Sequence, residues 1–221
     1  MKVAVISDIH ANFPALEKVL EDISRMPLFC CGDLVGYNTF PNEAIDLIRT
    51  NNATSLLGNH DRAVLTGDTG WFNSEAIKAI EWTAGKLTPE NRSFLKALPM
   101  THENEFYMVH GSPKNPLEGY IFPGDPDYVF SDFFNYTNRD IIILGHTHIP
   151  FVKKIEGKLI FNPGSVGQPR DSDPRASYAL LDTEKKEVKI KRVGYDIEKT
   201  SSAIMKAGLP KRLGIRLFRG I

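Results

Sequence analysis

The first third of the chain alternates between short apolar runs and segments with apolar residues at helical spacing. Val3 to Ile6, Leu28 to Cys31 and Thr54 to Leu57 are apolar runs without polar alternation. The segments between them, Phe13 to Ile23 and Asn42 to Ile48, have helical spacing. Apolar runs separated by helices are typical of a parallel sheet that is covered on both faces. The pattern predicts an α/β fold.

The middle of the chain has a different pattern. Strand signals are absent from residues 62–98, and helical spacing takes their place. We interpret this stretch as a helical insertion near the functional site, and not as a separate domain. Apolar runs return at Phe106 to Val109 and at Ile141 to Leu144.

The last part of the chain has the pattern of a β-meander followed by one helix. The predicted strands are Phe151 to Ile155, Leu159 to Phe161, Ser177 to Leu181 and Glu187 to Val193. Ile197 to Lys206 is the predicted helix. Two sheets packed face to face, with helices outside, would accommodate all of these segments.

Length and composition indicate a compact globular protein. A chain of 221 residues can bury one sizeable core, so we expect a single domain over residues 1–221, although length alone also allows two. Basic and acidic residues number 27 each, so no overall field attracts nucleic acid or anionic lipid. No apolar stretch reaches the roughly 20 residues that span a membrane, and a strand starting at Lys2 leaves no room for a signal peptide.

The two cysteines, Cys30 and Cys31, are adjacent within an apolar run. Neighbours on a strand point to opposite faces, so we expect buried free thiols and no disulfide. Free thiols are typical of a reducing compartment. We therefore expect a cytoplasmic protein.

Five of the six histidines lie in short polar blocks, each after an apolar run. Imidazole, carboxylate and carboxamide groups are the ligands of divalent first-row metals, and strand ends are where α/β sheets gather ligands. An extended backbone would present Asp8 and His10 on one side, and likewise His146 and His148. The blocks are Asp8-Ile9-His10, Gly32-Asp33, Gly58-Asn59-His60-Asp61, His110-Gly111 and Gly145-His146-Thr147-His148.

Taken alone, each block has an ordinary explanation. Asp33 could be a turn residue and Asn59 a left-handed residue, both common after glycine. His102, the histidine outside the blocks, is interpreted as solvated surface. The joint occurrence of the blocks in one chain predicts a metal-dependent hydrolase.

The order of the blocks resembles that of the calcineurin-like metallophosphoesterases. The resemblance covers Lys2 to about Ser165, and the segment from Asn162 to Arg170 is similar to a compact prokaryotic phosphodiesterase branch. It implies a four-layer αββα sandwich, with two facing mixed sheets flanked by helices and two metal ions at the centre. It also implies that one ion is bound by Asp8, His10, Asp33 and His148, and that Asp33 bridges to a second ion, which is bound by Asn59, His110 and His146.

Such a pair of ions suits phosphate-ester chemistry. Two divalent cations and two ligand carboxylates leave the site cationic, which stabilises the charge that builds up in the transition state. Ions roughly 4 Å apart can share a water and lower its pKa, so we expect hydroxide to attack phosphorus. Four imidazoles favour Mn, Fe, Co, Ni or Zn over Mg, and the sequence does not choose among those five.

Four further residues are candidates for catalysis or substrate binding. His60 is expected to donate a proton to the leaving group, with Asp61 orienting it and raising its pKa. Asn12 could bind phosphate or cap the helix that starts near Phe13. Arg170 could clamp a phosphate or lie on the surface.

Two segments outside the blocks allow a functional and a structural interpretation. Trp71, Phe72 and Trp82 could stack on a nucleobase, but their helical spacing favours core positions. The basic tail from Lys211 to Arg219 could bind a membrane or a partner subunit, but packing against a sheet edge is favoured.

We therefore predict a phosphoesterase that hydrolyses small phosphodiesters or nucleotides. The Gly32-Asp33 block lacks the arginine of protein phosphatases in the family, which disfavours the alternative of a phosphoprotein-phosphatase-like monoesterase. A non-catalytic scaffold on the same fold is a further alternative. Neutral charge disfavours a stable nucleic-acid complex. A homo-oligomer is compatible with the sequence.

Overall fold

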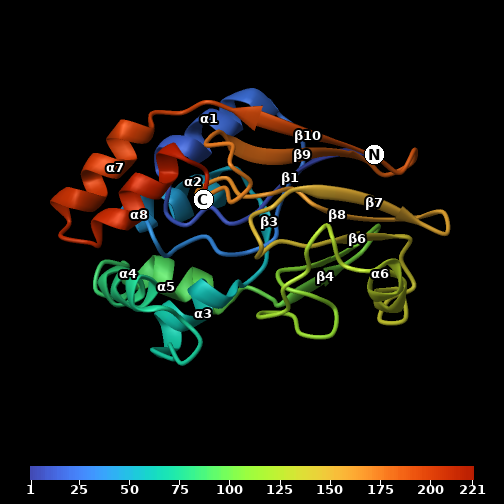
Figure 1. Cartoon of the computed structure of the whole chain (residues 1–221), viewed down its shortest axis with the longest axis horizontal. Helices are drawn as coiled ribbons and strands as arrows, with labels where there is room; N and C mark the ends of the chain where they lie inside the picture. The colour runs from blue at the N-terminus through green and yellow to red at the C-terminus, as the bar shows by residue number, and fades with distance from the viewer.

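The computed structural model describes all residues 1–221 and contains two five-stranded sheets (Figure 1). The first sheet contains, in spatial order, β10 (Glu187–Val193), β9 (Ala176–Asp182), β1 (Lys2–Ile6), β2 (Leu28–Cys30) and β3 (Thr54–Ser55). The second contains β4 (Thr101–Glu103), β5 (Tyr107–Val109), β6 (Ile141–Ile143), β8 (Lys158–Asn162) and β7 (Phe151–Ile155).

Both sheets are mixed. β1, β2 and β3 are parallel to one another, while β9 pairs antiparallel with β1 and with β10. In the second sheet β5, β6 and β8 are parallel, and β4 and β7 add antiparallel edges. Parallel strands place their carboxyl ends at one edge of a sheet, which is the edge that positions the site.

Nine helical segments lie outside the two sheets, some on their outer faces and others packed on neighbouring helices (Figure 1). They are α1 (Phe13–Ile23), α2 (Pro41–Thr50), α3 (Asn59–Thr66), α4 (Ser74–Ala84), α5 (Pro89–Lys96), α6 (Asp127–Phe133), α7 (Ile197–Lys206), α8 (Lys211–Ile215) and the 3₁₀ turn η1 (Arg216–Phe218). α1 shows how the sequence determines such a helix. Asn12 caps it, Pro14 occupies its first turn, and its buried face carries Leu16, Val19 and Ile23 at intervals of three and four residues.

Three layers of core separate the four layers of structure. Between the sheets, Val3 and Val5 of β1 pack with Ile143 and Phe161 of the second sheet. A larger core joins the outer face of the first sheet to α1 and α2. A third core packs α6, through Phe130, against the outer face of the second sheet. The expected α/β fold with two facing mixed sheets flanked by helices is confirmed.

Several local predictions were wrong. The strands after residue 150 do not form one meander, because β7 and β8 pair in the second sheet and β9 and β10 in the first. The short elements β4 and α6 were missed, because three to seven residues show too little periodicity. Helices α3, α4 and α5 occupy the stretch expected to be helical. No helix is both long enough and apolar enough to cross a membrane.

The basic tail packs on helices and not on a sheet edge. Leu213 of α8 and Leu217 of η1 are buried in a cluster with Ile204 of α7, Ala79 of α4 and Tyr37. Lys211, Arg212 and Arg219 are exposed, whereas the half-buried Arg216 lies over the Tyr37 ring, 6.0 Å from its centroid. The tail therefore covers α4 and Tyr37, which itself lies beside the candidate site.

Candidate metal centre and active site

The polar blocks of the sequence come together where strands of both sheets end. Within each sheet the strands that precede the blocks are parallel, so their carboxyl ends meet. All seven candidate ligands lie in this region and six of them are buried. In chain order they are Asp8 and His10 after β1, Asp33 after β2, Asn59 at the start of α3, His110 after β5, and His146 and His148 after β6.

The backbone that carries these residues is not extended. The φ angles are 53° at Asp8, 50° at His10, 54° at Asp33, 68° at His146 and 62° at His148. Non-glycine residues in this left-handed region cost about 1–3 kcal/mol each and are typical of functional sites. The prediction that an extended strand aligns each pair was wrong, since tight left-handed turns bring the side chains together.

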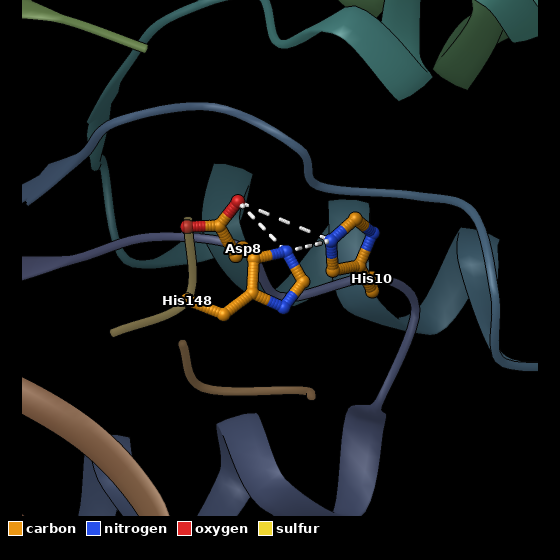
Figure 2. A group of neighbouring side chains, drawn as sticks. All are labelled: Asp8, His10 and His148. Carbon is orange, nitrogen blue, oxygen red and sulfur yellow. Dashed lines mark hydrogen bonds and ion pairs between the residues drawn. The ribbon is translucent and has the colours of Figure 1, made fainter. Parts of the chain in front are cut away.

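The first group of ligands contains Asp8, His10 and His148 (Figure 2). The Nε2 atoms of His10 and His148 are 3.0 Å apart. Asp8 Oδ1 lies 3.4 Å from His148 Nε2 and 3.9 Å from His10 Nε2. The ligand-type atoms of the three residues thus converge on one position.

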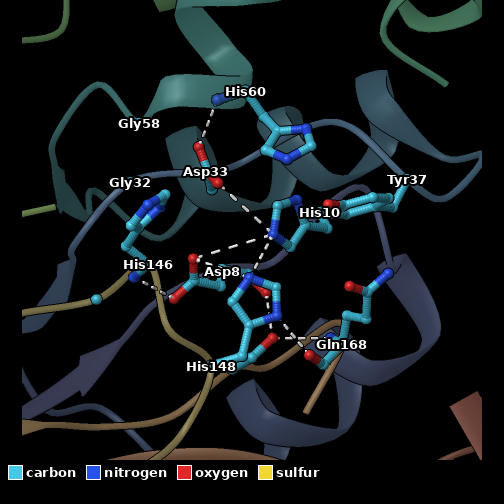
Figure 3. A network of polar contacts seen from close by, with 12 residues as sticks. Asp8, His10, Gly32, Asp33, Tyr37, Gly58, His60, His146, His148 and Gln168 are labelled. Atoms are coloured by element: carbon cyan, nitrogen blue, oxygen red, sulfur yellow. Dashed lines mark hydrogen bonds and ion pairs between the residues drawn. The ribbon is translucent and has the colours of Figure 1, made fainter. Parts of the chain in front are cut away.

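The second group contains Asp33, His110 and His146, whose ligand-type atoms also lie within 4.8 Å of one another. Asp33 Oδ2 is 3.4 Å from His110 Nε2, which is 3.0 Å from Asn59 Oδ1. The same Asp33 oxygen is 3.6 Å from His10 Nε2 of the first group (Figure 3). Asp33 therefore lies between the two groups, within 3.6 Å of an imidazole of each.

Backbone carbonyls fix the orientation of three of the imidazole rings. His10 Nδ1 lies 3.1 Å from the carbonyl oxygen of Val35, and His110 Nδ1 lies 2.8 Å from the carbonyl oxygen of Cys31. His148 Nδ1 contacts the carbonyl oxygen of Gln168 in the same way. A carbonyl only accepts, so Nδ1 carries a hydrogen in all three rings. In a neutral ring Nε2 then keeps a free lone pair, which is the arrangement found in metal-ligating histidines.

Several buried polar atoms of the site have no partner within the protein. Asp8 Oδ1, Asp33 Oδ2 and His146 Nε2 are buried without a hydrogen bond. An unpartnered buried polar atom is unfavourable, and a buried carboxylate oxygen more so. Divalent cations would satisfy all three atoms at once. The donor set, with two carboxylates, four imidazoles and one carboxamide, fits first-row metals.

The charge state of the metal-free protein also suits cation binding. Burial lowers the pKa of His146 to about 3 and that of His10 and His148 well below the usual value, so these imidazoles are neutral at pH 7. The pKa of Asp33 is lowered, against the effect of burial, by the neighbouring His110. Burial opposes protonation of His110, but Asp33 raises its pKa to about 9. Burial raises the pKa of Asp8 to about 7. Ligands must be deprotonated to bind metal, so cation binding would displace a proton from His110 and from any protonated Asp8.

Two glycines allow the close packing around Asp33 and His60. A Cβ atom on Gly58 would lie 2.0 Å from Asp33 Oδ1, and one on Gly36 would lie 2.6 Å from His60 Nδ1. Gly36 also has a φ of 98°, which side chains rarely adopt. These positions require glycine because nothing larger fits beside the Asp33 carboxylate and the imidazole.

Four of the seven candidate ligands line a cavity of about 300 Å³, and we call the seven ligands together with His60 its floor. Asp33, Asn59, His146 and His148 line its inner end together with His60. The remaining lining residues form what we call the cavity wall: Tyr37, Trp71, Phe72, Asn73, Ala76, Asn115, Glu118, Tyr120 and Arg170. The volume is within the range of small-molecule sites.

His60 lies on the cavity as predicted, but Asp61 does not act on it. The Asp61 carboxylate accepts hydrogen bonds from the backbone N–H groups of Leu34, Val35 and Gly58, at 3.0 to 3.2 Å. Burial lowers the pKa of His60 to about 4. The predicted orientation of His60 by Asp61 and the predicted rise of its pKa were therefore wrong. Asp61 instead joins the start of α3 to the loop after β2.

The two candidate phosphate-binding residues have different surroundings. Asn12 is fully buried, and its side chain donates to the Gly167 carbonyl at 2.9 Å and accepts from the Thr200 hydroxyl at 2.9 Å and from the Ala15 N–H. It caps α1 and does not line the cavity, so its predicted substrate contact was wrong. Arg170 does line the cavity, with a guanidinium N–H donating to Tyr37 Oη at 3.3 Å.

The structure adds residues that the sequence analysis did not single out. The Tyr37 ring lies 4.7 Å from that of His10 and 4.4 Å from that of His60, measured between centroids (Figure 3). Tyr120 lies against His146, with 4.1 Å between ring centroids. The core assignment of Trp71 was wrong, because this side chain is 84% exposed and lines the cavity. A loop aromatic has no periodicity that would reveal this position.

The fold agrees with comparisons to known proteins. Residues 1–186 match the model of the calcineurin-like phosphoesterase superfamily domain. The chain belongs to this superfamily. Its members are metal-dependent, which agrees with the clustered Asp and His side chains, and the protein is a hydrolase that acts on phosphate esters.

Individual relatives extend over most of this calcineurin-like chain. It is 43% identical to the uncharacterized protein MJ0912 of Methanocaldococcus jannaschii, over 99% of this chain and 98% of the relative. It is 26% identical to the phosphodiesterase YfcE of Escherichia coli K12, over 83% of this chain and 89% of the relative. The crystal structure of a metallophosphoesterase from Sphaerobacter thermophilus superposes with a TM-score of 0.89 at 35% identity, covering 100% of this chain and 99% of the other.

Proposed function

We propose that this phosphoesterase binds two divalent cations and hydrolyses small phosphodiesters or nucleotides. Asp8, His10, Asp33 and His148 would hold one ion, and Asp33, Asn59, His110 and His146 the other. The observation that carries the proposal is the shared position of Asp33, with one oxygen 3.6 Å from His10 Nε2 and 3.4 Å from His110 Nε2. The name of the E. coli relative supports a diester substrate.

When bound, the two cations would supply positive charge to the phosphoryl oxygens and lower the pKa of a coordinated water. Mixed nitrogen and oxygen ligation favours Mn, Ni, Fe, Co or Zn. The residues of the chain do the rest. Nδ1–H bonds to Val35, Cys31 and Gln168 keep the rings of His10, His110 and His148 in the ligating orientation.

His60 and Arg170 would act on the substrate. The neutral His60 ring has one N–H and no partner at Nδ1, so it can donate a hydrogen bond to the leaving oxygen. Arg170 Nε is likewise buried without a partner, while its NH2 group donates to Tyr37 and Gln168. A guanidinium held in this way is oriented to bind a phosphoryl oxygen.

The proposal is tested by reconstituting metal-stripped protein with Mn²⁺, Ni²⁺, Zn²⁺ or Mg²⁺. The readout is kcat/KM for bis(4-nitrophenyl) phosphate and for 4-nitrophenyl phosphate. We expect activity with a first-row metal, weak activity with Mg²⁺, and preference for the diester. Preference for the monoester would support the alternative of a protein-phosphatase-like monoesterase, and no hydrolysis with any metal would support a non-catalytic scaffold.

The sixth histidine provides a matched control. His102 lies on β4, half-buried against Phe29 and Phe106, and is remote from the cavity. His148→Asn should abolish diester hydrolysis and lower the metal content, whereas His102→Asn should change neither. Equal activity of the two variants would contradict the proposed ligand set.

We further propose a cytoplasmic location and no stable complex with nucleic acid. Cys30 and Cys31 are both free and buried, as is usual in a reducing compartment. Basic and acidic residues balance at 27 each, so no general attraction to polyanions is expected. A homo-oligomer stays a prediction.

A further inference from the structure

The cavity wall contains more aromatic surface than a phosphate requires. Trp71 and Phe72 lie between α3 and α4, and Tyr120 lies in the loop between β5 and α6. Two loops that are far apart in the chain thus place aromatic rings on one cavity, above the ligands. A phosphoryl group contacts cations and hydrogen-bond donors, so these rings serve another part of the substrate.

Trp71 has no structural role that explains its position. Its side chain is 84% exposed, the largest exposed fraction among the large apolar residues. Tryptophan is usually well buried, because it offers the largest apolar area of any side chain. An exposed indole on the rim of a cavity is therefore a binding surface for a flat apolar group.

Tyr120 provides a second ring in a fixed position. It is 54% exposed and packs against two rings, that of His146 at 4.1 Å between centroids and that of Phe122 at 6.0 Å with an interplanar angle of 9°. Contact with a candidate metal ligand links this ring directly to the floor of the cavity. A group stacked on Tyr120 would thus lie next to the phosphate.

The wall also carries a carboxylate without a partner. Glu118 lines the cavity, is half-buried, and its side chain makes no hydrogen bond or ion pair. A carboxylate only accepts hydrogen bonds, so it would bind a ligand edge that donates them. An aliphatic alcohol or an unsubstituted phenyl ring would leave this carboxylate unpaired.

We propose that the cavity wall is a nucleobase subsite, so that the substrate is a nucleotide ester whose base stacks on Trp71 and Tyr120. Glu118 would select guanine, because the edge of this base offers two adjacent N–H donors to one carboxylate. Stacking on aromatic side chains is a general mode of base recognition. This inference rests on the proposed function, since the phosphate would lie at the metal centre.

The test compares ligands that share the phosphate and differ in the base. Isothermal titration of the Mn²⁺-loaded protein measures Kd for guanosine 5′-monophosphate, adenosine 5′-monophosphate and ribose 5-phosphate. We expect the guanine nucleotide to bind at least about tenfold more tightly than ribose 5-phosphate, with the adenine nucleotide between them. Equal Kd values for the nucleotides and the sugar phosphate would overturn the subsite.

Variants locate the effect on the wall. Trp71→Ala should weaken guanosine monophosphate binding about tenfold and leave the Kd of ribose 5-phosphate unchanged, whereas Trp71→Phe should retain most of the affinity. Tyr128→Ala is the matched control, because Tyr128 is 74% exposed on α6 and does not line the cavity. Unchanged nucleotide binding by Trp71→Ala would refute the stacking role.

Glu118→Gln tests the base preference. The amide replaces one acceptor by a donor, so the guanine nucleotide should lose about tenfold in affinity and approach the adenine nucleotide. A wild-type protein without preference for guanine would refute the role of Glu118. A failure of the proposed function would be distinguishable. In that case neither the nucleotides nor ribose 5-phosphate would bind, and bis(4-nitrophenyl) phosphate would not be hydrolysed.

Discussion

The floor and the wall of the same cavity differ in burial and in the elements that hold them. The ligands of the floor follow strands of the two central sheets, and six of the seven are buried. The wall residues Trp71, Glu118 and Tyr120 lie in loops, and Trp71 and Tyr120 are 84% and 54% exposed. The floor is therefore fixed by the fold, while these three wall residues can vary with the substrate.

The difference indicates that metal binding is determined by the floor and substrate binding by the wall. Strained left-handed residues and fully buried carboxylates are unfavourable unless metal binding compensates for them. The floor is therefore adapted to bind metal. An exposed ring in a loop contributes little to stability and can change without disturbing the core. Changes to the floor should abolish the reaction, and changes to the wall should alter binding.

The largest effect is expected for Asp33→Asn. Loss of the Asp33 charge would weaken both proposed cation sites, and several kcal/mol of charge stabilisation corresponds to about a 10³-fold fall in kcat/KM. Steady-state kinetics and metal analysis measure the result. Asp46→Asn, at an exposed position of α2, is the control and should match wild type. Retained activity in Asp33→Asn would contradict the view that the floor, and not the wall, is essential for the reaction.

A smaller effect is expected for His60, which lies at the floor without being a proposed ligand. His60→Ala should lower kcat about 10- to 100-fold, since a hydrogen bond to a charged oxygen contributes about 1.5–3 kcal/mol. His60→Gln keeps an N–H donor and should retain more activity than His60→Ala. If the two variants are equally impaired, proton transfer and not hydrogen bonding is the role of His60.

The effect on the wall should be smaller again and should appear in KM. Arg170→Met removes a guanidinium that faces the cavity, so KM for the diester should rise about tenfold with little change in kcat. Arg175→Met is the control, because Arg175 lies in the same loop but is paired with Asp173 at 2.7 Å on the surface. A fall in kcat with unchanged KM would place Arg170 in the chemical step.

The smallest effect is expected for Asn12, which is close to the floor in sequence but not part of it. Asn12→Ala removes the cap of α1 and its bond to Gly167, so the free energy of unfolding should fall by about 1 kcal/mol or somewhat more. KM should not change. Chemical denaturation and kinetics on the same sample measure both. A raised KM with normal stability would restore the substrate contact that the structure argues against.

The sequence predicted the floor more completely than the wall for a physical reason. Ligands such as Asp8 and His110 follow apolar runs that form strands, and strand ends of parallel sheets meet. The meeting of the blocks at one place could therefore be predicted, while the role of each residue as a ligand was implied by the family resemblance. The backbone turns that bring these side chains together could not be predicted, because the left-handed φ angles of Asp8, His10 and His146 leave no signal in an apolar–polar pattern.

Apart from Arg170, most of the wall could not be predicted, since it depends on where loops fold back. Tyr120 reaches His146 and Tyr37 reaches His60 through contacts between residues that are far apart in the chain. No periodicity marks such residues. The misjudged role of Asp61 has a similar cause, because the backbone N–H groups that occupy its carboxylate come from the loop after β2.

Anomalous diffraction from a crystal soaked in Mn²⁺ tests the central claim most directly. The account predicts two manganese peaks roughly 4 Å apart, with Asp33 between them and the other six side chains around them. A site without peaks at saturating Mn²⁺, or peaks bound by other residues, would contradict it.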